Sequence, residues 1–261
     1  MDIKCLDIDF DKIIESGQVF RCRRLSDYKV EFITNQTKLL IVETEIGFTV
    51  EQFGFEIDVY KYFDLERNYE DIYRKVKESD DKFLQNAVEA GKGLRLLKQD
   101  LWEMIVSFII SQRNNIKRIK DSIEHLCRDC GCYYKNGDYY GFPSPEQIFY
   151  CNKSLSYLGY REEYIRLIAK KIIDNEFDLE ALYEMSEDEA FKTLLSVRGI
   201  GPKVANCILL FGLAKIDAFP IDVWIQRVLD KYYNGTWNYG TFSGINGILQ
   251  MYIFFFIRNN S

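Results

Sequence analysis

The sequence predicts an α+β protein, in which a small antiparallel sheet precedes a larger all-helical region. Polar and apolar residues alternate within 28–33, 39–42 and 47–50, and turn-forming residues separate these segments, as expected for antiparallel strands. Farther along the chain, apolar residues recur with a helical period instead. We therefore expect an N-terminal α+β domain over residues 1–92 and a helical domain over residues 93–261.

The helices that follow the strands are predicted from capping residues and from the spacing of apolar residues. After the strands we expect a helix over residues 65–76, and another that starts near Asp80-Asp81. Residues 101–110, LWEMIVSFII, are apolar almost all round, which predicts a buried helix. The next helix starts near Ile116, after an asparagine cap. A last helix is expected to contain residues 246–254.

Composition limits the class of protein. Of the 261 residues, 47% are hydrophobic, so the chain can bury a substantial core and wholesale disorder is excluded. The net charge of −6 is unusual for a nucleic-acid binder and predicts weak non-specific affinity. The N-terminus is too charged for an apolar targeting segment, and no apolar run is long enough to span a membrane.

Seven cysteines without a secretory signal indicate free thiols in a reducing compartment. Three of them, Cys127, Cys130 and Cys132, are close in sequence and suggest a metal motif at first sight. The other cysteines have no regular spacing and the only histidine is His125, so four ligands do not come together in a familiar pattern. We expect no metal site.

The most informative stretch is a helical hairpin over residues 187–212. Ser186 and Glu189 form a capping box, so the first helix begins there. Val197-Arg198-Gly199-Ile200-Gly201 interrupts the helical period, and both glycines can adopt positive φ. Pro202 then occupies the first position of the second helix, where its missing N–H costs nothing. The free N–H groups at such a helix start form an anion site suited to a phosphate that is held without sequence preference.

Two candidate catalytic residues lie in this hairpin and just after it. Lys203 lies in the first turn of the second helix, where the helix dipole disfavours an ammonium, and a neutral amine is a nucleophile that can form a Schiff base. The alternative is an ordinary surface lysine. Asp222 opens a third helix and is a candidate N-cap. Its carboxylate could also face the lysine and stabilise a developing cation.

This combination of hairpin, Gly-Ile-Gly-Pro-Lys and Pro-Ile-Asp-Val resembles the helix-hairpin-helix DNA glycosylase superfamily. The resemblance implies that Lys203 belongs to the bifunctional branch, which couples base excision to strand cleavage, and it is strongest for the 8-oxoguanine DNA glycosylases. Residues 16–21 resemble the family's Gly-Gln-x-Phe-Arg segment. There the carbonyl of the glycine, here Gly17, accepts a hydrogen bond from the N7–H that only oxidised guanine has; the alternative for Gly17 is a simple turn glycine.

The resemblance also assigns a base pocket. It implies that Gln250 reads the Watson–Crick edge of the flipped base and that Phe254 stacks on one face, since residues four apart share one side of a helix. Cys207 would lie under the other face of the base. The plain alternatives are a solvent-facing Gln250 and an ordinary core cysteine.

The resemblance implies further contacts with DNA. Its polar loop enters the gap left by the flipped base, and its Tyr-Arg pair wedges into the kinked duplex. The chain departs from the family at Arg113, where asparagine is usual, and at Trp224, where some members have a phosphate-contacting histidine. Arg113 and Arg118 could equally be solvated. The residues expected to contact DNA are Arg113, Asn114, Arg118, Tyr160, Arg161, Gly199, Gly201 and Val204.

We therefore predict a monomeric DNA repair enzyme that excises 8-oxoguanine from duplex DNA through a Schiff base on Lys203 and then cuts the strand by β-elimination. No cofactor is expected, although the resemblance implies a monovalent cation at the hairpin carbonyls. No cysteine follows Cys207, so the iron–sulfur cluster of some relatives is not expected. The location would be the bacterial cytoplasm, at the nucleoid, or a eukaryotic nucleus, with no membrane partner. Two alternatives stay open: an alkylated-base glycosylase that uses water and only Asp222, and a non-catalytic DNA-binding module.

Overall fold

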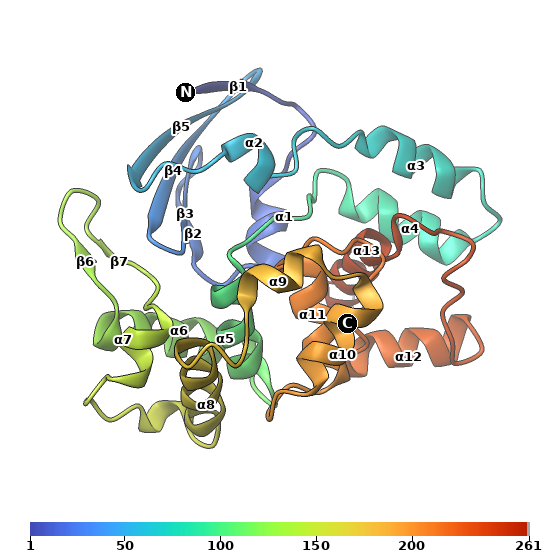
Figure 1. The fold of residues 1–261 in the computed structure, drawn as a ribbon. Coiled ribbons are helices and arrows are strands. Elements are labelled where there is room, and N and C mark those ends of the chain that lie inside the picture. Colours follow the sequence, from blue (N-terminus) through green and yellow to red (C-terminus); the bar gives the residue numbers. More distant parts are fainter. Residues whose placement is uncertain (260–261) are drawn as a thin grey trace.

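The computed structural model describes residues 1–259 and confirms the α+β class. Its N-terminal part is a five-stranded antiparallel sheet with strand order β1-β5-β4-β3-β2 (Figure 1). The three predicted strand segments lie in β3, β4 and β5, and the shorter β1 and β2 form the two edges. The strands are β1 (Asp2–Lys4), β2 (Cys22–Ser26), β3 (Lys29–Thr34), β4 (Thr37–Thr44) and β5 (Gly47–Gly54).

The core of this sheet is aromatic. Helix α1 (Phe10–Glu15) places Phe10 against Phe48 and Phe63, with ring centroids 5.1 and 5.6 Å apart and rings nearly perpendicular. Such edge-to-face pairs add to the free energy gained by burying the rings. Because α1 is fixed on the sheet, the segment that follows it, which contains Gly17, is held at the boundary with the helical region.

Three helices continue the N-terminal part: α2 (Val59–Tyr62), α3 (Tyr69–Lys77) and α4 (Lys82–Gly91). The predicted start at Asp80-Asp81 is confirmed, because Asp81 caps α4. The helix expected over residues 65–76 begins only at Tyr69, since the Asn68 side chain accepts the Glu70 N–H and caps the helix there.

The rest of the chain is mainly helical, as predicted. The buried helix over residues 101–110 is α5, and Asn115 caps the helix that follows, as the sequence indicated. The last helix, α13, packs against α4 (Figure 1). The packing is close, since a Cβ on Gly91 would lie 2.4 Å from the Tyr252 ring. The helices are α5 (Leu101–Ser111), α6 (Ile116–Cys130), α7 (Pro145–Phe149), the 3-10 helix η1 (Ser156–Leu158), α8 (Arg161–Ile173), α9 (Leu179–Glu184), α10 (Glu187–Leu195), α11 (Pro202–Phe211), α12 (Val223–Tyr232) and α13 (Asn246–Asn259).

One element of the helical region was not predicted. A two-stranded hairpin, β6 (Tyr133–Tyr134) and β7 (Tyr139–Tyr140), projects beside the sheet (Figure 1). The Tyr139 hydroxyl donates to the carbonyls of Gln36 and Phe53, each at 2.9 Å. These contacts fix the hairpin to the sheet, so the region predicted as all-α contains a small β element.

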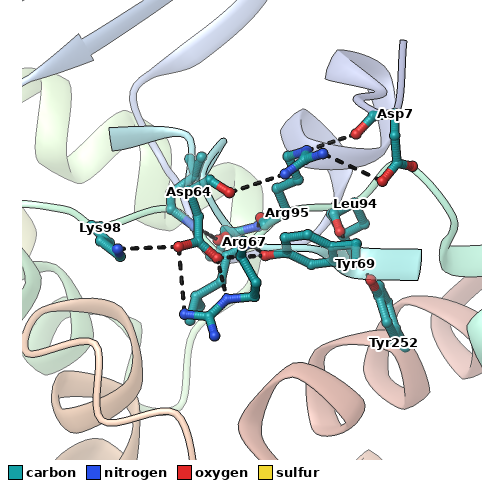
Figure 2. Close-up of polar contacts among 11 residues, drawn as sticks. Asp7, Asp64, Arg67, Tyr69, Leu94, Arg95, Lys98 and Tyr252 are labelled. Atoms are coloured by element: carbon teal, nitrogen blue, oxygen red, sulfur yellow. Dashed lines mark hydrogen bonds and ion pairs between the residues drawn. The ribbon is translucent and has the colours of Figure 1, made fainter. Parts of the chain in front are cut away.

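A buried polar cluster fixes the connection between α4 and α5 (Figure 2). The Asp64 carboxylate accepts from Arg67 Nε at 2.5 Å and from the Tyr69 hydroxyl at 3.0 Å. Arg95 Nε donates to the backbone carbonyl of Asp7 at 2.6 Å. We call this the Asp64 cluster; its members are Asp7, Asp64, Arg67, Tyr69, Arg95 and Lys98.

Within residues 1–259, no helix is both long enough and apolar enough to cross a bilayer.

Candidate active site

The hairpin has the predicted construction. Helix α10 begins with the capping box of Ser186 and Glu189, and α11 begins at Pro202. The expectation of two positive-φ glycines is half right: Gly199 has φ +95°, whereas Gly201 has φ −94°, because it is the extended N-cap of α11. A Cβ on Gly199 would lie 2.5 Å from the Tyr164 ring, so the close approach of α8 also requires glycine there.

The start of α11 lacks a side-chain cap, since Gly201 has no side chain to cap it with. The sides of the hairpin differ in this respect: α10 has a capping box, whereas the first N–H groups of α11 have no side-chain acceptor. Free N–H groups and the helix dipole together favour an anion at this point.

Lys203 and Asp222 line the same cavity, as the sequence predicted. Lys203 extends from the first turn of α11, and its Nζ lies 5.3 Å from the centre of the Phe108 ring. Asp222 is the N-cap of α12: one oxygen, Oδ1, accepts the N–H groups of Trp224 and Ile225, both at 2.9 Å. The cap therefore fixes the carboxylate with one oxygen and leaves the other available to the cavity.

The residues expected to form a base pocket come together around that pair. The inner cavity has a volume of about 60 Å³ and opens into a cleft of about 490 Å³, and the two share Gly17, Phe108, Lys203, Asp222 and Phe254. Sequence reasoning did not single out several of the lining residues, whose positions depend on tertiary packing. These are Ser16, Phe108, Phe211, Pro220 and Met251.

The structure gives the burial and contacts of three residues that were expected to line this pocket. Gln250 is only 5% exposed and donates from Nε2 to the Pro220 carbonyl at 2.8 Å, so the solvent-facing alternative is wrong. Gly17 has φ +78°, and a Cβ there would lie 3.3 Å from the Phe254 ring. Cys207 is buried below Lys203; burial raises the pKa of its thiol, and the nearby Lys203 partly opposes that shift.

Three of the eight residues predicted to contact DNA line the cleft: Arg113, Asn114 and Val204. Arg118 is exposed in the first turn of α6. Gly199 and Gly201 form the turn of the adjacent hairpin.

The tyrosine and arginine expected to form a wedge lie at the start of α8. Tyr160 is 48% exposed, and the Arg161 guanidinium lies 4.7 Å from the centre of its ring. Gly159, with φ +58°, is the C-cap of η1. Trp224, where the sequence departs from the family, lines the cleft with 39% of its surface exposed.

A buried carboxyl lies at the other end of α5. Glu103 Oε2 accepts the Asn35 N–H at 2.5 Å. Burial raises the pKa of Glu103 to about 7, although the nearby Arg21 favours its ionised form. This group lies outside the cleft and belongs to the packing of α5 on the sheet.

The described residues give no ligand set for a metal: within 1–259, no three His, Cys or carboxylate side chains gather as metal ligands would. In the hairpin, the Val197 carbonyl accepts the Ile200 N–H and the Gly199 carbonyl accepts Gln112 Nε2. A monovalent cation there stays a prediction, and no step proposed below uses one.

The fold and the site together define a helix-hairpin-helix protein with a lysine and an aspartate at the mouth of a buried pocket. Two family models match the chain. The model described as "8-oxoguanine DNA glycosylase, N-terminal domain" matches residues 1–105, and the model described as "HhH-GPD superfamily base excision DNA repair protein" matches residues 106–240. The chain belongs to the 8-oxoguanine DNA glycosylase family within this superfamily.

Similar proteins include a probable N-glycosylase/DNA lyase of Methanothermobacter thermautotrophicus, 35% identical over 198 residues, which cover 66% of this chain and 62% of the relative. The match thus spans less than two thirds of that relative. MBOgg1, solved with a low-affinity DNA ligand, is 31% identical with a TM-score of 0.88, covering 98% of this chain and 94% of the other. The 8-oxoguanine glycosylase/lyase of Clostridium acetobutylicum, solved with DNA containing cytosine opposite 8-oxoguanine, is 26% identical with a TM-score of 0.87, covering 100% and 98%.

Proposed function

We propose that this protein is a bifunctional glycosylase and lyase that removes 8-oxoguanine from duplex DNA and then cleaves the strand at the abasic site. The observation that supports this most is the shared cavity of Lys203, Asp222, Gly17, Gln250 and Phe254. An amine and a carboxylate lie in this cavity beside polar and aromatic side chains, which is the set of groups that a flipped purine would need.

The proposed chemistry starts at C1′ of the flipped nucleotide. Lys203 Nζ, as the free amine, forms a bond to C1′ while the C1′–N9 bond breaks and the base leaves with the electron pair. The sugar acquires cationic character in this step, and the Asp222 carboxylate stabilises it. Opening of the C1′–O4′ bond and loss of the amine proton then give a Schiff base.

The second reaction uses that Schiff base. The iminium makes the C2′ proton acidic, so its removal expels the 3′ phosphate and breaks the C3′–O bond. Hydrolysis of the remaining imine regenerates the lysine. The uncapped start of α11 would hold a backbone phosphate during both reactions.

Selectivity is proposed to depend on one proton. Oxidised guanine has an N7–H, whereas guanine has a lone pair at N7. The Gly17 carbonyl would accept that proton and would face a second lone pair in guanine, which costs free energy in a desolvated pocket. The Gln250 amide would read the Watson–Crick edge of the base, and the Phe254 ring would stack on its face.

Borohydride trapping on a duplex that contains 8-oxoguanine tests this proposal directly. Wild type should give a covalent protein–DNA band, and Lys203→Gln should give none, because only a lysine can form the reducible imine. Lys192→Gln, on the exposed side of α10, is the matched control and should trap like wild type.

Each alternative predicts a different result in the same assay. Release of the oxidised base without a trapped band would indicate a glycosylase that uses water. Binding without release or trapping would indicate a non-catalytic DNA-binding module and would contradict the proposal.

A further inference from the structure

The end of α5 joins the hairpin to the cleft. Gln112 is the C-cap of α5, and its side-chain Nε2 donates to the Gly199 carbonyl at 2.8 Å, 87 residues away in the sequence. Gly199 is the positive-φ residue of the hairpin turn. The hairpin is therefore hydrogen-bonded through Gln112 to the loop at the mouth of the cleft.

The backbone of the same residue contacts the wedge. The Gln112 carbonyl accepts Arg161 Nε at 3.0 Å and also Arg161 Nη2, and the Tyr160 hydroxyl lies 3.5 Å from it. Arg161 Nη2 lies 3.4 Å from the Arg113 carbonyl as well. One residue thus contacts the hairpin through its side chain and the wedge through its backbone.

The loop between these contacts is held in a defined shape. Arg113 has φ +48°, a conformation that a non-glycine residue adopts only when its surroundings require it. Asn114 Nδ2 donates to the Ile110 carbonyl at 3.3 Å, and Asn115 caps α6. Loss of the Gln112 side-chain bond would free the hairpin from a loop that stays anchored at its other end.

We propose that Gln112 is a positioning residue, which fixes the start of α11 and the Tyr160–Arg161 wedge to each other so that both engage one duplex as a rigid unit. This inference rests on the proposed function only in that this face of the molecule receives DNA. Gln112 takes no part in the chemistry, because Lys203 and Asp222 are held by α11 and α12.

The test replaces the donor and keeps the shape: Gln112→Met has a similar length and no N–H group. The probe is a duplex with a tetrahydrofuran abasic analogue, and affinity is measured by fluorescence anisotropy. The variant loses the bond to the Gly199 carbonyl and a second one, at 3.3 Å, to the Ile109 carbonyl within the same helix. We expect roughly tenfold weaker binding, because without the Gly199 bond two binding elements are no longer held together. The trapping rate on a natural abasic site at saturating DNA should change less than about threefold, since kcat does not depend on prior positioning once the complex is complete.

Gln85→Met is the matched control. Gln85 Nε2 also donates to a backbone carbonyl, that of Ser79 at 2.6 Å, but it does so in the turn between α3 and α4. Its Nε2 also donates to the Lys77 carbonyl at 3.2 Å, so each variant loses two amide-to-carbonyl bonds and the thermal melting curves should resemble each other. Only Gln112→Met should lose affinity for the abasic duplex.

Three results would overturn the inference: unchanged affinity in Gln112→Met, an equal loss of affinity in Gln85→Met, or a tenfold fall in the trapping rate at saturating DNA with affinity preserved.

Arg161→Lys gives a further test. If both residues act in one unit, the affinity loss of the double variant is smaller than the product of the single losses; multiplicative losses would contradict the proposal. Binding to the abasic analogue needs no excision. The role of Gln112 can therefore be tested even if wild type releases no 8-oxoguanine.

Discussion

Two aspartates of this protein are held in opposite ways. Asp64 is 2% exposed, and its carboxylate contacts Arg67, Tyr69 and Lys98. Asp222 uses a single oxygen for the cap of α12, and within residues 1–259 no side-chain or backbone donor is seen on the other. The Asp64 carboxylate is fully partnered inside the fold, whereas Asp222 keeps one oxygen without such a partner in the cleft.

This difference indicates what each region contributes. A fully partnered buried charge fixes neighbouring segments, and removing one partner leaves the others uncompensated. A carboxylate with an available oxygen costs stability but can respond to charge that develops on a ligand. Substitutions at four positions test this contrast.

Asp222→Asn separates the cap from the charge. Asparagine caps helices about as well as aspartate, so the fold and the melting temperature should be preserved. We expect the single-turnover excision rate to fall by about 10²- to 10³-fold, because the cationic sugar loses its counter-charge. Asp178→Asn is the control, since Asp178 caps α9 with the same geometry far from the cleft. Near-normal excision by Asp222→Asn would show that Asp222 only caps the helix.

Asp64→Asn should produce the reverse pattern. Asn tolerates the positive φ of residue 64 but cannot balance Arg67 and Lys98. We expect a loss of about 2–3 kcal/mol in the free energy of unfolding, below the value for a fully buried pair because both cations are partly exposed. Urea denaturation measures it, with the exposed pair partner Asp71→Asn as a control that should change stability by less than about 0.5 kcal/mol. Excision per folded molecule should be unchanged. A loss of excision by the folded variant would show that Asp64 acts on the reaction as well as on stability.

Glu103→Gln tests a buried carboxyl that belongs neither to the Asp64 cluster nor to the cleft. Burial raises the pKa of Glu103 from 4.5 to about 7, so between these values the folded protein keeps a proton that the unfolded chain has released. The resulting stability is complete below about pH 4.5 and is lost as the pH rises through 7. Gln copies the protonated form and can still accept the Asn35 N–H. We expect the stability of the variant relative to wild type to rise by about 2–3 kcal/mol between pH 5 and pH 8, measured by urea denaturation. If variant and wild type differ in stability by the same amount at pH 5 and at pH 8, this expectation is wrong.

Gly17→Ala should give the smallest effect. Both Gly17 and Gly244 have positive φ, so alanine should cost about 1 kcal/mol of stability at either position. A Cβ at Gly17 would also crowd the Phe254 ring, whereas a Cβ at Gly244 meets nothing within 4 Å. Excision should therefore fall roughly fivefold in Gly17→Ala only, since a shift of a few tenths of an ångström at a base pocket has a modest cost. Equal excision by the two variants would show that the pocket tolerates the extra methyl group.

The sequence predicts some features of this molecule better than others for a physical reason. Capping residues such as Ser186, Asn115 and Asp222 act on N–H groups two or three residues away, so their signals are local and the helix starts that they predicted were correct. The start predicted near residue 65, without a cap, was wrong. The β6–β7 hairpin was missed because its strands have two residues each and depend on Tyr139 contacts with the sheet. Local pattern cannot contain that information.

In the site, too, some residues are marked by the local sequence and others are not. Lys203 and Asp222 could be predicted because helix starts and turn residues mark their positions along the chain. Phe108 and Gln112 could not, since nothing in an apolar helix and its cap indicates that one ring lies beside Lys203 Nζ or that one amide reaches Gly199. Their roles arise from the way α5 packs on α11.

The separation in sequence between the two walls of the pocket sets an order on folding. The pocket needs Gly17 from the start of the chain and Phe254 from its last helix, so its walls are more than 230 residues apart in sequence. During synthesis the sheet and the hairpin can form while α13 is still inside the ribosome, but the pocket cannot. Contacts of such long range form late and slowly. A nascent chain of this protein can therefore hold a finished hairpin for some seconds before it has any cavity in which a base could be read.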